Sequence, residues 1–285
     1  MIRPGTYNTL TILRSIEHGL ILCDEEENEV LLPQSYVDNS MKVGSDIEVF
    51  IYLDSEDRII ATTETPKIKL HEFALLRVVD VNRFGAFLDW GLKKDLLVPF
   101  REQNVDMEEG RSYVVFLYID DQTNRLVASA KIRNILDNDE IDLVPNQEVD
   151  ILVYAKTDLG YKVIINHLYD GLMYHNEVFR EFHVGEVSRA YVKRIREDNK
   201  IDISIQQQGY SAISSLTERI LAVLAEGDGF LDLTDKSVPD EIQERLQMSK
   251  KSFKKAIGYL YKNKQIRMES EGIFLLDKPS VDEEE

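Results

Sequence analysis

The chain has 285 residues, of which 30% are charged, and its net charge is −18. A chain of this length usually forms about two or three domains. The acidic excess argues against a protein whose whole surface binds nucleic acid, because phosphate contact needs Lys and Arg. The excess is uneven, since positions 1–66 hold 13 acidic and 4 basic residues. Any site for a polyanion is therefore predicted downstream of that segment.

The single cysteine and the amino-terminal sequence bear on the cellular compartment. Cys23 has no second cysteine to pair with, so neither an intramolecular disulfide nor a thiolate metal cluster can form. The start, Met1–Gly5, lacks the apolar core of a signal peptide, and no stretch approaches the roughly 18 apolar residues of a membrane span. We expect a cytoplasmic protein.

Three segments of the chain repeat one pattern. Each has a glycine in a β-prone run, a second glycine in a later turn, and a cation before a short final run. These landmarks are Gly19, Gly44 and Arg58; Gly85, Gly110 and Arg125; and Gly160, Gly185 and Lys200. Three landmarks in a constant order predict one small fold used three times, over residues 1–66, 67–144 and 145–210. Units this small have little core of their own, so we expect neighbours to pack together.

The second unit shows the repeated fold most clearly. Its β-prone runs are Phe73–Val79, Gly85–Leu88, Leu96–Val98, Val114–Ile119 and Leu126–Ala128, with turn residues between them. Five short strands of this kind predict a small β-barrel. In the second run Ala86, Leu88 and Trp90 share one face, which places the aromatic Phe87 on the opposite, non-core face.

These residues resemble the motif string of the S1 RNA-binding domain, a five-stranded barrel of the OB type. The resemblance implies a ligand surface made of two aromatics, a histidine after the third strand, and an Asp and an Arg near the last strand. Here those places hold Phe84, Phe87, Asp120 and Arg125, with Pro99 instead of the histidine. Bases would stack on the two rings while cations contact the phosphates. The alternative is that the rings close the end of the barrel.

The other two units match this surface less closely. The third unit holds Lys162, Tyr174, Arg196 and Lys200 at the corresponding places, which implies one aromatic and three cations for RNA, and Lys193–Arg196 extends the positive charge. The first unit holds His18, Ile21, Pro33, Asp54 and Arg58 beside the acidic run Asp24–Glu27. We expect the first unit to have lost nucleic-acid binding and to serve in packing or protein contact.

The hydrophobic period changes to that of helices after residue 210. We predict helices over Ser215–Glu226, from about Pro239, and over Lys250–Asn263 with Ser249 as cap, a strand at Phe230–Leu233, and a hairpin of Ile266–Met268 and Ile273–Leu276. This order resembles the winged-helix fold, followed by the acidic end Val281–Glu285. The predicted fourth domain therefore covers residues 211–285.

The third of these helices has a basic face. Its apolar residues fall on one side and its lysines on the other, namely Lys250, Lys251, Lys254, Lys255 and Lys262. In winged-helix proteins this is the recognition helix, so the resemblance implies a candidate nucleic-acid-binding helix. The alternative is an ordinary solvated face.

The sequence carries no pattern typical of catalysis or of a cofactor. His167, His175 and His183 have no ligand spacing for a metal, and neither a phosphate-binding GxxxxGK loop nor a nucleophile elbow is present. We expect no enzyme activity, no metal and no cofactor.

Three S1-like barrels followed by a winged helix resemble the conserved virulence factor B family, and the resemblance covers essentially the full length. The fold class is thus expected to be multidomain and mainly β. The resemblance implies a regulator of virulence-related gene expression that binds single-stranded RNA. Two alternatives stay open: a scaffold of the translation or transcription machinery that contacts proteins through the acidic first barrel, and a DNA-binding winged-helix regulator.

Overall fold

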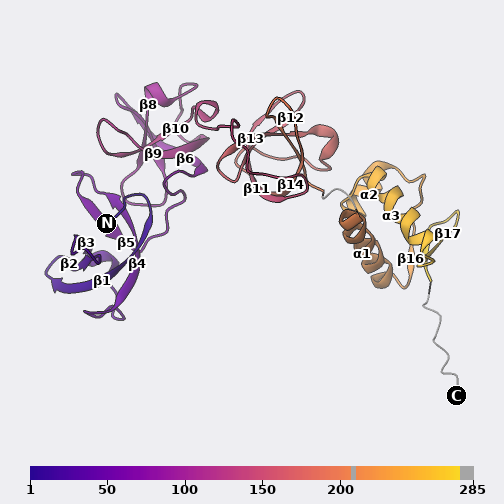
Figure 1. The fold of residues 1–285 in the computed structure, drawn as a ribbon, viewed down its shortest axis with the longest axis horizontal. Helices are drawn as coiled ribbons and strands as arrows, with labels where there is room; N and C mark the ends of the chain where they lie inside the picture. The colour runs from indigo at the N-terminus through magenta and orange to yellow at the C-terminus, as the bar shows by residue number, and fades with distance from the viewer. Residues whose placement is uncertain (207–209, 277–285) are drawn as a thin grey trace, which may run out of the picture.

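The computed structural model describes residues 1–206 and 210–276, with side chains omitted for 210–215. It contains three small β-barrels and a winged-helix domain, which follow one another along the chain (Figure 1). The fold class predicted from the sequence is therefore confirmed. The first barrel consists of β1 (Tyr7–Ile16), β2 (Gly19–Cys23), β3 (Glu29–Pro33), β4 (Asp46–Leu53) and β5 (Ile59–Thr62).

The next two barrels repeat this strand order. The second consists of β6 (Phe73–Asn82), β7 (Gly85–Asp89), β8 (Leu96–Pro99), β9 (Ser112–Ile119) and β10 (Leu126–Ser129). The third consists of β11 (Glu148–Lys156), β12 (Gly160–Ile165), β13 (Tyr169–Tyr174), β14 (Val187–Ile195) and β15 (Ile201–Ser204). A single 3₁₀ turn follows the third strand of each barrel.

The first glycine of the repeat is required by a close backbone contact. Gly85 lies opposite Pro99, with φ of +147°, and a Cβ atom added there would come within 2.2 Å of the Val98 carbonyl oxygen. Gly19 and Gly160 face the corresponding carbonyls in the same way, at 2.0 and 2.1 Å. No side chain fits at these distances, so this position accepts only glycine in all three barrels.

The second glycine pairs with a bulge in the first strand. Gly110 donates its backbone N–H to the Val78 carbonyl at 2.9 Å, where β6 shifts register against β7. Gly44 and Gly185 make the same bond to Ile12 and Val153, at 2.8 and 2.7 Å, beside equivalent register shifts. A bulge bends the strand and lets a small sheet curl into a barrel. The shared bond explains why both glycines recur.

The second barrel differs from the other two at one seam. Parallel pairing joins β3 to β5 in the first barrel and β13 to β15 in the third, which closes both. The second barrel is a five-stranded sheet in the order β10-β9-β6-β7-β8, and no ladder joins β8 to β10. Its two end strands therefore lie side by side without the main-chain bonds that seal the other barrels.

Neighbouring barrels share buried apolar residues, as their small size predicts. Phe50 and Tyr52 of the first barrel pack with Trp90 of the second, at ring centroid distances of 6.0 and 6.2 Å. Phe73 of the second barrel packs in one cluster with Leu152 and Ile164 of the third. Burial of large apolar side chains stabilises each junction, so the three barrels are packed units rather than independent beads.

The last domain has the predicted winged-helix elements. It consists of α1 (Tyr210–Glu226), β16 (Phe230–Leu231), α2 (Pro239–Leu246), α3 (Lys250–Lys262), β17 (Ile266–Met268) and β18 (Ile273–Leu275), with the sheet order β16-β18-β17. Ser249 caps α3 by accepting a hydrogen bond from the Ser252 N–H at 3.0 Å, as predicted.

Some predicted limits in this domain were wrong. The helix α1 begins at Tyr210 and not at Ser215, and β16 ends at Leu231 and not at Leu233. Local capping signals are weak evidence for a helix start when the helix is stabilised by packing, and Ile220 and Leu224 are fully buried. The side chain of Ser215 and the acidic end Val281–Glu285 lie outside the described residues. Among those described, no helix combines the length and apolarity needed to cross a membrane.

Candidate nucleic-acid interface

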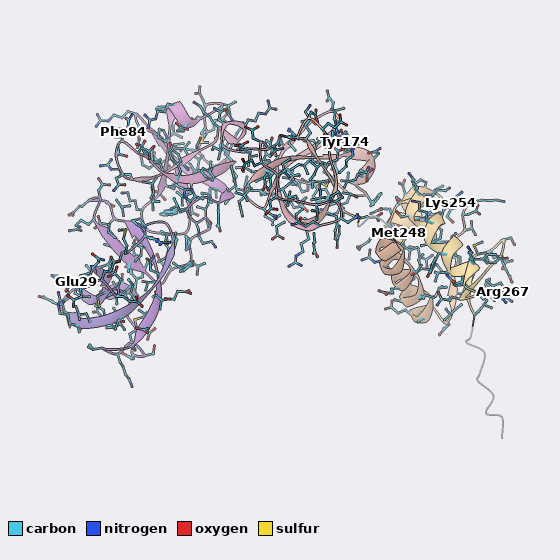
Figure 2. The ribbon with its side chains drawn as sticks, in the orientation of Figure 1. Glu29, Phe84, Tyr174, Met248, Lys254 and Arg267 are labelled. Carbon is cyan, nitrogen blue, oxygen red and sulfur yellow. The ribbon has the colours of Figure 1, made fainter. Side chains whose placement is uncertain are left out.

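The second barrel presents an aromatic surface at the start of β7. Phe84 is 58% exposed and Phe87 is half-buried, while their neighbours Ala86 and Leu88 are fully buried. Figure 2 places Phe84 at the outer side of this barrel. The guanidinium of Arg83 lies over the Phe84 ring, 4.7 Å from its centroid. The alternative that both rings seal the barrel end does not hold for Phe84, because more than half of it faces solvent.

A hollow of about 300 Å³ adjoins the two rings. The second barrel contributes Phe84, Phe87, Lys94, Asp95 and the residues along the open seam between β8 and β10. The first barrel contributes Leu53, Ser55 and Asp57. The hollow therefore lies at the junction of two barrels. Residues of the first barrel were not predicted here, because their proximity comes from packing and no local motif signals it.

Two cations of the second barrel are already paired with the first. Asp57 accepts hydrogen bonds from the guanidinium of Arg125 and from the Lys94 ammonium, the latter at 3.2 Å. Lys94 also donates to the Asp54 carbonyl oxygen at 2.6 Å. Asp57 therefore compensates one of these two positive charges, and its hydrogen bonds hold both cations against the first barrel.

Asp120 has a different environment from the one implied by the S1 resemblance. Its side chain is buried and accepts hydrogen bonds from the Gln122 and Thr123 N–H groups and from Arg101. The bond from the Gln122 backbone is the main reason why the pKa of Asp120 lies below its ordinary value. These bonds fix the turn before β10, which carries Arg125. Asp54 holds the same turn in the first barrel by accepting from the Glu56 and Arg58 N–H groups.

The predicted residues of the third barrel come together around a second hollow, of about 470 Å³. Lys162, Tyr174, Arg196 and Lys200 all line it, together with the exposed Leu159. Each cation already has a carboxylate partner: Lys162 pairs with Asp170, Arg196 with Asp202, and Lys200 with Asp198. Arg196 also donates to the Tyr174 hydroxyl. The site is assembled, but its positive charge is compensated within the barrel.

Asp202 is the centre of this ion-pair network. Only 3% of its side chain is exposed, and it accepts from Arg194 at 2.8 Å and from Arg196 at 2.7 Å. Burial alone raises the pKa of Asp202, but the hydrogen bonds from the two arginines outweigh it and hold the pKa below its ordinary value. The positions of Arg194 and Asp202 are occupied in the second barrel by Tyr118 and Val127, which carry no charge.

The basic face of α3 is as predicted. Phe253, Ala256, Ile257 and Leu260 are buried, whereas Lys251, Lys254, Lys255 and Lys262 are exposed. Lys250 donates to the Lys236 carbonyl oxygen, and Lys254 lies 3.7 Å from Asp235. Within the described part of the chain, no carboxylate pairs with Lys251, Lys255 or Lys262. Figure 2 labels Lys254 on this helix.

Two protein-family models match separate domains of this chain. A family model described as an S1 domain matches residues 4–64 and 72–131, and one described as a CvfB-like winged helix domain matches residues 218–275. The third barrel is recognised by the bulge and glycine bonds that it shares with the other two. S1 domains and winged helices bind nucleic acids, so by its domain types the chain is a nucleic-acid-binding regulator.

Relatives match the chain over most of its length. The uncharacterized protein YitL of Bacillus subtilis is 30% identical over 277 residues, which cover 94% of this chain and 92% of the relative. Conserved virulence factor B of Staphylococcus saprophyticus is 29% identical over 259 residues, covering 88% and 87%. A crystal structure of a multidomain protein with nucleic acid binding domains from Streptococcus pneumoniae gives a TM-score of 0.41 at 22% identity, covering 96% of this chain and 98% of that one.

Proposed function

The chain belongs to the conserved virulence factor B family, and from this premise we propose that it is a non-enzymatic regulator of gene expression that binds single-stranded RNA. The second barrel is the principal binding domain in this proposal. The third barrel and α3 add further contacts. The protein would meet its RNA in the cytoplasm.

One observation carries the proposal: the exposed ring of Phe84, with Phe87 beside it and Arg83 over its face. A solvent-exposed ring next to a hollow is a stacking platform for an unpaired base, and each stacked base contributes about 1–3 kcal/mol. Duplex bases are stacked on one another and cannot reach such a ring. The platform therefore favours a single strand.

Charges around the platform support contact with the backbone of that strand. Arg83 and Lys93 are exposed, they directly precede the lining residues Phe84 and Lys94 in the chain, and among the described residues neither has a carboxylate partner. Lys93 instead donates to the Ser35 hydroxyl and lies 4.7 Å from the centroid of the Tyr36 ring. Both cations are available to a phosphate, which would make binding fall steeply with salt concentration.

The exposed lysines of α3 favour a second candidate function, which is contact with duplex DNA. Lys251, Lys255 and Lys262 give this helix a charged face without compensating acids in the described chain. The face carries no arginine, so contact with the phosphate backbone is favoured over base reading. A protein-contact role for the acidic first barrel remains a prediction. Nuclease-resistant co-purification of a partner would support that role.

The test compares the full-length protein and its Phe84→Ala/Phe87→Ala variant on labelled single-stranded RNA, single-stranded DNA and duplex DNA. We expect single-stranded RNA to bind best, and the double variant to bind it at least about tenfold more weakly, because a stacking platform is lost. Tyr261→Ala is the comparison variant, since it removes an aromatic side chain that is 55% exposed on α3. Because α3 only adds contacts in this proposal, Tyr261→Ala should weaken RNA binding less than the double variant does.

The outcomes separate the candidates. Unchanged RNA affinity in a folded double variant would refute the role of the second barrel. Stronger binding of duplex DNA, weakened by Tyr261→Ala and not by the double variant, would transfer the function to α3.

A further inference from the structure

Asp95 lines the hollow between the first two barrels and has an unusual environment. Its side chain is half-buried, and within the described chain it makes neither a hydrogen bond nor an ion pair. Asp89, six residues earlier, has both: it pairs with Lys67 and accepts from the Gly91 N–H at 2.9 Å. Burial, followed by the nearby charges of Asp89 and Asp80, raises the pKa of Asp95. A partly desolvated carboxylate without a donor is costly, and a ligand with donors would remove that cost.

The balance of charge indicates which part of a nucleotide enters the hollow. Its charged lining consists of Asp57, Asp95, Lys94 and Arg125, and Asp57 already holds both cations. With Asp95 ionised, these four charges sum to zero, so a phosphate placed inside would add negative charge that the lining does not compensate. A base is uncharged and can stack on Phe84 and Phe87. The hollow therefore suits a base, while phosphates suit the exposed cations Arg83 and Lys93.

The chemistry of Asp95 then selects among the bases. An ionised carboxylate only accepts hydrogen bonds, and its two oxygens can accept two parallel ones. Guanine presents two adjacent donors, its N1–H and its N2 amino group. Cytosine and adenine present one amino group, and uracil presents a single N–H between two carbonyl oxygens that a carboxylate repels. The Ser55 hydroxyl, which has no hydrogen-bonding partner in the described chain, lines the same hollow.

We propose that this hollow between the first and second barrels is a base-specific pocket, an inference that rests on the proposed binding of single-stranded RNA. It takes a base with Watson–Crick donors, guanine best of all, and Asp95 is the residue that determines specificity. Because Ser55 and Asp57 belong to the first barrel, that barrel takes part in RNA recognition although its own S1 surface is degenerate. The open seam beside β8 and β10 leaves this wall of the pocket free of ladder bonds.

The experiment measures fluorescence anisotropy with the full-length protein and three labelled octamers: oligouridylate, the same oligomer with one central guanosine, and the same with one central inosine. Inosine keeps the N1–H of guanine and lacks the amino group. A bidentate contact discriminates by about 1–3 kcal/mol, so we expect the guanosine oligomer to bind about tenfold more tightly than oligouridylate, with inosine between them.

The variant Asp95→Asn should reduce this tenfold preference to about twofold or less, because an amide offers one acceptor in place of two. Its affinity for oligouridylate should stay within about twofold. Asp121→Asn is the matched control. Asp121 is an exposed residue of the same barrel, without a partner in the described chain and outside the hollow, and its variant should keep the full preference. Thermal melting of both variants confirms that they fold.

Equal binding of the three octamers by the wild-type protein would overturn the base-specific pocket and leave the proposed function intact. An equal gain in affinity for all three in Asp95→Asn would also overturn it, because Asp95 would then act only by repelling phosphate. Failure of every octamer to bind would instead refute the proposed function, and the pocket with it.

Discussion

The second barrel exposes a phenylalanine ring beside its hollow, whereas the third barrel surrounds its hollow with cations that are already paired with carboxylates. Both have the same strand order, the same bulge and the same two glycine contacts. The glycine contacts and the bulge that form the barrel are therefore independent of the residues on its ligand surface. The two copies differ instead in a few surface side chains, namely the exposed Phe84 of the second barrel and the paired cations Lys162, Arg196 and Lys200 of the third.

The largest expected effect concerns the close glycine contact that the second and third barrels share. Gly85→Ala and Gly160→Ala should each cost about 2–4 kcal/mol of unfolding free energy, because the added Cβ would collide with a carbonyl oxygen. Urea denaturation measures the loss. Gly110→Ala is the control: its φ is +80° but the nearest atom to its Cβ is 3.7 Å away, so only strain of about 1 kcal/mol is expected. A loss below that value in either barrel would show that the glycine contact is dispensable.

The next effect concerns two carboxylates with opposite pKa shifts. The folded pKa of Asp202 is lowered, so its contribution to stability is present above the ordinary carboxyl range and is lost as the pH falls through the folded pKa. Asp202→Asn should therefore cost about 2–3 kcal/mol at neutral pH, where it leaves two arginines without their buried partner, and less in acid. Thermal melting against pH provides the measurement.

Asp95 should behave in the opposite way. Its folded pKa is raised, so the protonated form favours folding, and that contribution is lost as the pH rises through the folded pKa. Asp95→Asn should be more stable than the wild type at neutral pH, with the gain shrinking on acidification. Parallel pH profiles for the two variants would contradict the assigned environments.

The smallest expected effect tests whether the pairing of cations with carboxylates weakens RNA binding by the third barrel. Asp198→Asn would release Lys200, now 2.6 Å from that carboxylate. Exposed pairs are weak, so RNA affinity should rise only about twofold at low salt. Anisotropy titration measures the change, and Glu197→Gln, which removes the charge of an adjacent exposed acid, should raise affinity less. Equal gains in both variants would mean that overall charge matters and that the pairing does not.

Much of the fold followed from the sequence because its signals are local. The glycines at 19, 85 and 160, the alternation of Ala86 and Leu88 with Phe87, and the change to helical period after residue 210 each reflect backbone geometry within a few residues. The buried and basic faces of α3 followed from its 3.6-residue period in the same way. The start of α1 was misplaced because the capping pattern at Ser215 is a local signal and lies inside the helix, which begins at Tyr210.

Tertiary structure alone decided which charges remain available. Arg125 and Lys94 are cations near a predicted site, but their carboxylate partner Asp57 belongs to the first barrel, and only folding brings it close. Asp57 lies 68 residues before Arg125 and reaches it because the first two barrels pack through Phe50, Tyr52 and Trp90. The hollow beside Asp95 is likewise formed by residues of both barrels. Local patterns encode strands and turns, whereas pairing between distant side chains depends on the three-dimensional arrangement of the domains.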